Sequence, residues 1–86
     1  MIIDIFNHFS EMENDEKIFL KTFCERLRNL RLERNLSQEM LANDANIPIN
    51  QIGRIERAEI ATSLSTLFKI SKALNISLQF LFPENS

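Results

Sequence analysis

The scarcity of turn-forming residues is the feature that most limits how this chain can fold. Its 86 residues include one glycine, Gly53, and two prolines, Pro48 and Pro83. Tight hairpin turns between strands rely on such residues. The chain is instead rich in Leu, Ile, Glu, Arg and Lys, which favour helix. These observations predict an all-α fold.

The length and composition predict one cytoplasmic domain. Eighty-six residues are enough for one compact domain and too few for two, and the 44 % of apolar residues supply a core. No segment approaches the roughly 18 apolar residues of a membrane span, and the first ten residues lack a signal peptide's features, so no membrane partner is expected. One cysteine, Cys24, and one histidine, His8, cannot complete a zinc site, so neither metal nor cofactor is expected.

The charges divide the chain into two parts. The net charge is -2, but residues 1–16 alone carry -5, which leaves +3 for residues 17–86. Apolar residues in the first part are spaced as on one side of a helix. They are Ile2, Ile5, Phe6, Phe9 and Met12. We therefore expect an acidic amphipathic N-terminal arm over 1–16 and a modestly basic body over 17–83.

The apolar spacing of the body predicts four helices and a short C-terminal turn. The expected helices cover 17–34, 38–44, 48–56 and 64–74, and one or two further turns cover 77–82. Ser37 and Ser63 precede the second and fourth helices, where serine is a favoured N-cap. Pro48 suits the first turn of the third helix. Asn35 tolerates the left-handed conformation that often ends a helix.

Residues 38–55 form two short helices joined by a tight turn. Ala42 is small where these helices touch, and Asn46 lies where a positive φ is usually needed. With these features, LSQEMLANDANIPINQIGRIER and SLSTLFKISKALNISLQFLF resemble the helix-turn-helix of Cro and phage-repressor (XRE-type) regulators, over residues 20–82. The resemblance implies a five-helix, lambda-repressor-like DNA-binding domain, to which the arm adds an N-terminal helix.

Three positions depart from the family pattern. Asn46 and Ala58 stand where glycine is usual, and Thr62 where proline is frequent. Asparagine tolerates a positive φ, whereas Ala58 in that conformation would cost about 1 kcal/mol. Glu59 is acidic in a loop that is often basic and close to DNA phosphates in the family.

The third predicted helix offers a surface for reading DNA once Ile52 and Ile55 face the core. Asparagine pairs bidentately with adenine and arginine with guanine, so Asn50 and Arg54 are expected to contact bases in the major groove. Ile49 suits a thymine methyl group. The expected DNA-contacting residues are Gln38, Pro48, Ile49, Asn50, Gln51, Gly53, Arg54 and Arg57.

Two of these expected contacts depend on the backbone. Gln38 opens the second helix, where its amide and the free N–H groups could hold a phosphate. Gly53 lacks a side chain, which would let the third helix approach DNA closely.

One charged pair is expected to be structural. Arg31 and Glu56 lie at the rims of apolar helix faces, where an unpaired charge is costly. The resemblance implies a salt bridge between them. The other basic residues of the first long helix are expected to flank the duplex or stay solvated: Lys21, Arg26, Arg28 and Arg34.

Phe80 and Phe82 are the expected dimer interface. Phe80 does not fit the inward spacing of Leu78 and Leu81, so we expect it to face outward with Phe82 nearby. The resemblance implies dimers formed through the last helix, with two recognition helices roughly 34 Å apart. The N-terminal arm could instead cover these residues or swap between protomers.

The sequence therefore predicts a sequence-specific DNA-binding regulator, most simply a dimeric repressor of operator DNA. The alternative is an antitoxin that binds a toxin and autoregulates its operon. A helical module without DNA binding is a third reading, supported by the acidic balance and Glu59. No enzyme is expected, because His8 and Cys24 lie on different predicted helices without supporting motifs.

Overall fold

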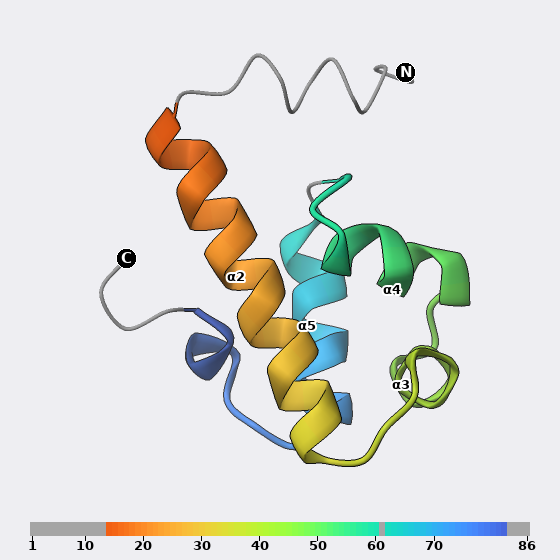
Figure 1. Ribbon diagram of the computed structural model, residues 1–86. Helices are drawn as coiled ribbons and strands as arrows, with labels where there is room; N and C mark the ends of the chain where they lie inside the picture. The colour runs from red at the N-terminus through yellow and green to blue at the C-terminus, as the bar shows by residue number, and fades with distance from the viewer. Residues whose placement is uncertain (1–13, 61, 83–86) are drawn as a thin grey trace.

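The computed structural model describes residues 14–60 and 62–82, and this part of the chain is all-helical (Figure 1). Its elements are α2 (Asn14–Glu33), α3 (Gln38–Ala45), α4 (Ile49–Glu56), α5 (Leu64–Ala73) and the 3-10 helix η1 (Leu78–Leu81). The all-α prediction is confirmed. The helix predicted from Ile2 to Met12 lies outside the described residues.

Two helix starts differ from the prediction. Helix α2 already includes Asn14, so the first long helix begins three residues before the predicted start at residue 17. Asp15 and Glu16 lie in its first turn, where negative charge favours the helix N-terminus. Helix α4 begins at Ile49, because Pro48 keeps an extended conformation with φ -64° and ψ 143°. Pro48 is therefore the N-cap, and the helix begins one residue later than predicted.

Local capping explains where the other helices begin and end. The Ser37 hydroxyl accepts a hydrogen bond from the Met40 N–H, and the Ser63 hydroxyl accepts one from the Thr66 N–H. Both predicted N-caps are confirmed. Four residues with positive φ separate the elements: Asn35, Asn46, Ala58 and Asn75. A Cβ disfavours this conformation in all four residues. The asparagines have a side-chain amide that can form local hydrogen bonds and offset this cost, whereas the alanine has none.

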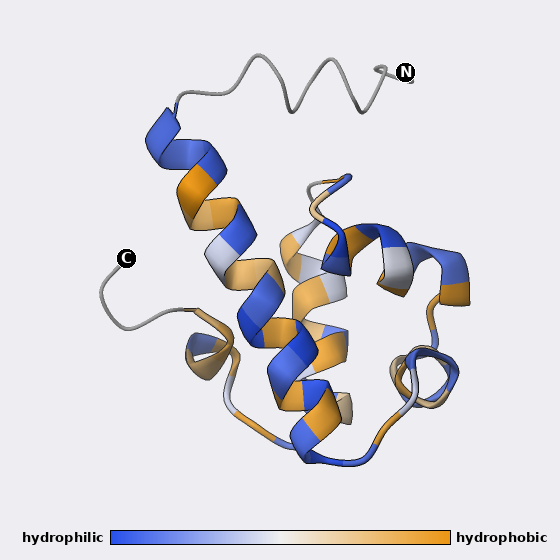
Figure 2. Ribbon diagram, viewed as in Figure 1, coloured by the Kyte–Doolittle hydropathy of each residue, from blue (hydrophilic) through white to orange (hydrophobic). Residues whose placement is uncertain are grey.

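The core forms where the helices meet. Helix α3 packs against α4 and α5, and α2 packs against α4 and η1. Figure 2 shows apolar and polar residues alternating along α2 and α4, as expected for helices with one buried side. The buried apolar residues are Phe23, Cys24, Leu27, Leu41, Ala42, Ala45, Ile52, Ile55, Leu67, Ile70, Leu74 and Leu81. Burial raises the pKa of the Cys24 thiol to about 11.

The C-terminal segment is tied to α2 by two arginines. Arg26 Nε donates a hydrogen bond to the Phe80 carbonyl oxygen (2.8 Å), and Arg34 Nε donates one to the Leu74 carbonyl oxygen (2.7 Å). These two side chains were expected to flank DNA or stay solvated, and that expectation is wrong. They instead satisfy backbone carbonyls at the end of α5 and in η1.

Phe82 also departs from its predicted position. Its ring is half-buried and stacks on Phe23, with ring centroids 5.3 Å apart, and on Phe19, with centroids 6.4 Å apart. Phe80 is 55 % exposed, as predicted. The two rings thus have different environments, because the chain turns at η1 and directs only Phe82 onto α2.

Within residues 14–60 and 62–82, no helix is long and apolar enough to cross a membrane.

Candidate nucleic-acid interface

A tight turn sets the relation between α3 and α4. Asn46 has φ 60° and ψ 47°, and the Ile47 N–H donates a hydrogen bond to the Ala42 carbonyl oxygen (3.0 Å). Ala42 is only 1 % exposed, which allows the two short helices to approach each other. The chain then leaves the turn through extended Pro48 into α4.

The core determines which side of α4 faces solvent. Ile52 and Ile55 are fully buried, so the opposite side of the helix is left outside. Asn50 lies in the first turn and is exposed, and Ile49 beside it is 49 % exposed. Arg54 follows Asn50 by four residues, one helical turn further along the same side, and its side chain is 39 % exposed.

Gly53 does not lie on this exposed side, which corrects the prediction. It is buried, and a Cβ added to it would lie 3.1 Å from Arg57 Nη1 and 3.4 Å from Gln38 Oε1. Both atoms are ends of flexible side chains that cover the glycine. The missing side chain therefore makes room for Arg57 and Gln38, and not for a DNA backbone.

The Gln38 side chain is also occupied within the protein. Its Nε2 donates a hydrogen bond to Glu56 Oε1 (3.0 Å), so the amide does not point freely outward as predicted. The Ser37 hydroxyl caps the Met40 N–H, whereas the N–H groups of Gln38 and Glu39 precede the helix's own hydrogen bonds. These first backbone N–H groups of α3 could meet a phosphate.

The predicted ion pair between Arg31 and Glu56 is present beneath this surface. Arg31 Nε lies 2.7 Å from Glu56 Oε2 and Nη2 lies 3.0 Å from Oε1, a bidentate arrangement. Arg31 Nη1 also donates to the Leu36 carbonyl oxygen (2.8 Å). The side chains are 8 % and 2 % exposed. The pair therefore joins α2 to the end of α4 and fixes α4 in its position.

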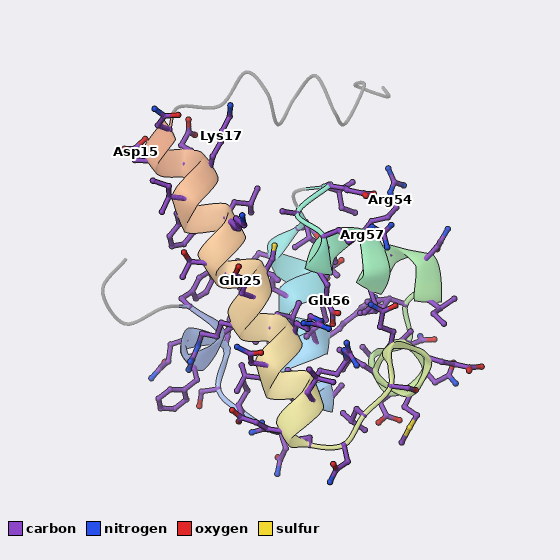
Figure 3. The ribbon with its side chains drawn as sticks, in the orientation of Figure 1. Asp15, Lys17, Glu25, Arg54, Glu56 and Arg57 are labelled. Atoms are coloured by element: carbon purple, nitrogen blue, oxygen red, sulfur yellow. The ribbon has the colours of Figure 1, made fainter. Side chains whose placement is uncertain are left out.

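A second cluster of charges lies at the C-terminal end of α4, and the sequence did not reveal it. Arg57 Nε and Nη2 lie 2.8 and 3.2 Å from the two carboxylate oxygens of Glu59, and Arg54 Nε lies 4.0 Å from Oε1. The hydrogen bond raises the pKa of Arg57 and lowers that of Glu59. Figure 3 shows both arginines on the outer side of α4, whereas Glu56 points inward. The sequence feature that could have indicated this cluster is the position of Glu59 two residues after Arg57, with Ala58 between them.

The sequence of these helices matches a known protein family. A helix-turn-helix family model matches residues 27–81, which include α3, α4, α5 and η1. This chain belongs to the helix-turn-helix family.

Two similar proteins are a control protein and an immunity repressor. The chain is 44 % identical over 55 residues to the control protein C.SmaI of Serratia marcescens, covering 64 % of this chain and 66 % of that protein. It is 35 % identical over 65 residues to the immunity repressor protein of Bacillus phage phi105, covering 76 % of this chain and 45 % of the repressor. The match thus spans just under two thirds of one relative and less than half of the other.

Two solved structures share the helix-turn-helix arrangement. The restriction-modification controller protein C.AhdI from Aeromonas hydrophila has a TM-score of 0.72 and 38 % identity, with 73 % of this chain and 96 % of the controller covered. An HTH_3 family transcriptional regulator from Vibrio cholerae has a TM-score of 0.70 and 31 % identity, with 74 % and 36 % covered. The fold of this chain thus matches nearly the whole C.AhdI chain.

The described part of this helix-turn-helix protein contains no group of three or more metal-ligating side chains. One side of α4 and the turn after it carry exposed polar side chains. Asn50, Arg54 and Arg57 are donors for hydrogen bonds to base edges and phosphates, which is the chemistry of a DNA-reading surface.

Proposed function

We propose that this protein is a sequence-specific DNA-binding transcriptional regulator, most simply a dimeric repressor, that reads operator DNA with α4 in the major groove. The observation that supports this most is the position of Asn50 and Arg54, one turn apart on the exposed side of a helix whose other side is anchored in the core. A helix held in this way can present the same side chains to DNA each time it binds.

The contacts of α4 divide into base reading and positioning. Asn50 pairs with adenine and Arg54 with guanine, each good bidentate contact adding about 1–3 kcal/mol of discrimination. Exposed Ile49 meets a thymine methyl group. Gln51, Arg57 and the turn at Pro48 lie beside these residues and approach the sugar-phosphate backbone.

Near Gln38, the proposed contact uses the backbone. The side-chain amide already donates to Glu56 Oε1, so the phosphate contact at this helix end is assigned to the N–H of Gln38. Gln38 thus fixes the orientation of α3 on DNA without carrying sequence information.

A dimer would place two copies of α4 on successive turns of the duplex. This chain is similar to the C.AhdI and C.SmaI controllers and to the phage immunity repressor, and this similarity supports the regulator in preference to an antitoxin. The proposed contact between protomers is made by Phe80, which is 55 % exposed on η1. Two recognition helices about 34 Å apart match a two-fold symmetric operator.

The test is binding to the DNA upstream of the protein's own gene, measured by fluorescence anisotropy at two salt concentrations. Changing Asn50 and Arg54 together to alanine should abolish the preference for that DNA over a scrambled duplex. The matched control changes Lys69 and Gln79 to alanine, which removes the same charge and one amide outside the α3–α4 pair.

The two results have distinct meanings. Specific, salt-sensitive binding that survives in the control and is lost in the Asn50 and Arg54 variant supports the proposal. Equal binding of all sequences by wild type and variant would contradict the assignment of α4 as the recognition helix.

A further inference from the structure

The turn after α4 returns the chain toward the arginines of the recognition helix. The Ala58 N–H donates to the Ile55 carbonyl oxygen and the Glu59 N–H donates to the Arg54 carbonyl oxygen, both at 2.9 Å. Ala58 has φ 59° in this turn, a conformation that disfavours a residue with a Cβ. The backbone thus adopts an unfavourable conformation at the point that places Glu59 beside Arg54 and Arg57.

The carboxylate of Glu59 contacts these guanidinium groups where a phosphate could. It receives two hydrogen bonds from Arg57, at 2.8 and 3.2 Å, and Arg54 Nε lies 4.0 Å from Oε1. Carboxylates and phosphates accept the same bidentate hydrogen bonds from arginine. The three side chains are between 39 % and 58 % exposed, so a duplex can reach them.

We propose that Glu59 is an internal competitor of DNA phosphate for Arg57. In the free protein the carboxylate holds Arg57 and lies within ion-pair distance of Arg54, and a backbone phosphate must replace it when DNA binds. Exposed ion pairs are weak, so the phosphate can displace it. Glu59 therefore limits the affinity for DNA of any sequence. The inference rests on the proposed function.

A role for Glu59 in orienting Arg57 would change the affinity for DNA in the opposite direction. If the carboxylate oriented Arg57 for a contact with a base, removing its charge would weaken specific binding. If it competes with phosphate, removing its charge strengthens binding. The sign of the change in affinity therefore distinguishes the two roles.

The experiment compares wild type with Glu59→Gln, which keeps the size of the side chain and removes its charge. We expect affinity for both upstream and scrambled DNA to rise by about two- to five-fold, the range that corresponds to losing an exposed ion pair. The slope of log K against log salt concentration should stay unchanged, because a phosphate replaces Glu59 at Arg57 in the wild type as well and both proteins neutralise the same number of phosphates.

The matched control is Glu25→Gln, which changes the net charge equally on α2, away from both arginines (Figure 3). This variant should leave the affinity for DNA unchanged. Thermal unfolding of both variants checks that they remain folded.

Each result decides between the possibilities. Unchanged or weaker binding by Glu59→Gln, or an equal gain in both variants, overturns the competitor role while leaving the proposed function intact. Wild-type protein that binds neither its upstream DNA nor scrambled DNA overturns the proposed function, and the competitor role with it.

Discussion

Two arginine–glutamate pairs near α4 have opposite degrees of burial, and burial decides what each contributes. The Arg31 and Glu56 side chains are 8 % and 2 % exposed, whereas those of Arg57 and Glu59 are 58 % and 47 % exposed. A buried charge must be paired and hydrogen-bonded, whereas an exposed pair competes with water and adds little stability. The first pair therefore serves the fold, and the second is available to a ligand.

The buried pair gives a prediction at the level of single residues. Changing Glu56 to alanine leaves the Arg31 guanidinium buried without its carboxylate and removes the acceptor for Gln38 Nε2. We expect the free energy of unfolding to fall by about 3–5 kcal/mol, measured by urea denaturation.

The control for this prediction is Glu25→Ala on the exposed surface of α2. It should change the free energy of unfolding by no more than about 0.5 kcal/mol. A loss in Glu56→Ala as small as that of the control would show that the buried pair does not hold α2 to α4.

At the level of elements, the residues that begin and end the helices can be recognised from the local sequence. Ser37 and Ser63 cap α3 and α5 through their hydroxyl oxygens. Asn35, Asn46 and Asn75 take the left-handed conformation at three helix ends. The joint between α4 and α5 differs because an alanine occupies the left-handed position there.

This joint can be stabilised by a substitution. Ala58→Gly removes the Cβ that clashes at φ 59°, while glycine loses more backbone entropy on folding. We expect the free energy of unfolding to rise by up to about 1 kcal/mol, measured by thermal and urea unfolding.

The control is Ala73→Gly, which places the same substitution in the last turn of α5. There the helical conformation favours alanine, so stability should fall by about 1 kcal/mol. Equal losses in the two variants would contradict the strain assigned to Ala58.

At the level of the whole molecule, the C-terminal segment both completes the core and leaves an apolar surface. Leu81 is fully buried, and Phe82 stacks on Phe23. Phe80 lies between them in sequence and is 55 % exposed. One short 3-10 turn thus separates a ring that stabilises the monomer from a ring available to a second copy.

Substitution of each ring should have a different effect. Phe80→Glu is expected to convert the proposed dimer to a folded monomer, seen as a lower mass by sedimentation equilibrium with an unchanged helical circular dichroism spectrum. Phe82→Ala removes ring packing on α2 and should lower the free energy of unfolding by about 2 kcal/mol. An unchanged mass for Phe80→Glu would exclude this residue from the interface.

Features that arise within a few residues of chain could be predicted from the sequence alone. Apolar spacing and the scarcity of glycine predicted an all-α chain, serines predicted two helix starts, and Asn46 predicted the turn. The family pattern also identified the buried partners Arg31 and Glu56. The helix starts and the turn follow from hydrogen bonds and side-chain periodicity within single helices, whereas the Arg31–Glu56 pair joins two helices and was predicted with the help of the family pattern.

The positions of several site residues depend on the packing of the helices against one another. Gly53 is covered by Arg57 and Gln38, the Gln38 amide is bound to Glu56, and Phe82 packs on α2. Arg26 and Arg34 hold backbone carbonyls 54 and 40 residues away in sequence. These contacts depend on how separate helices approach one another and on which side chains then fill the remaining space, and spacing within a single helix carries no record of that packing.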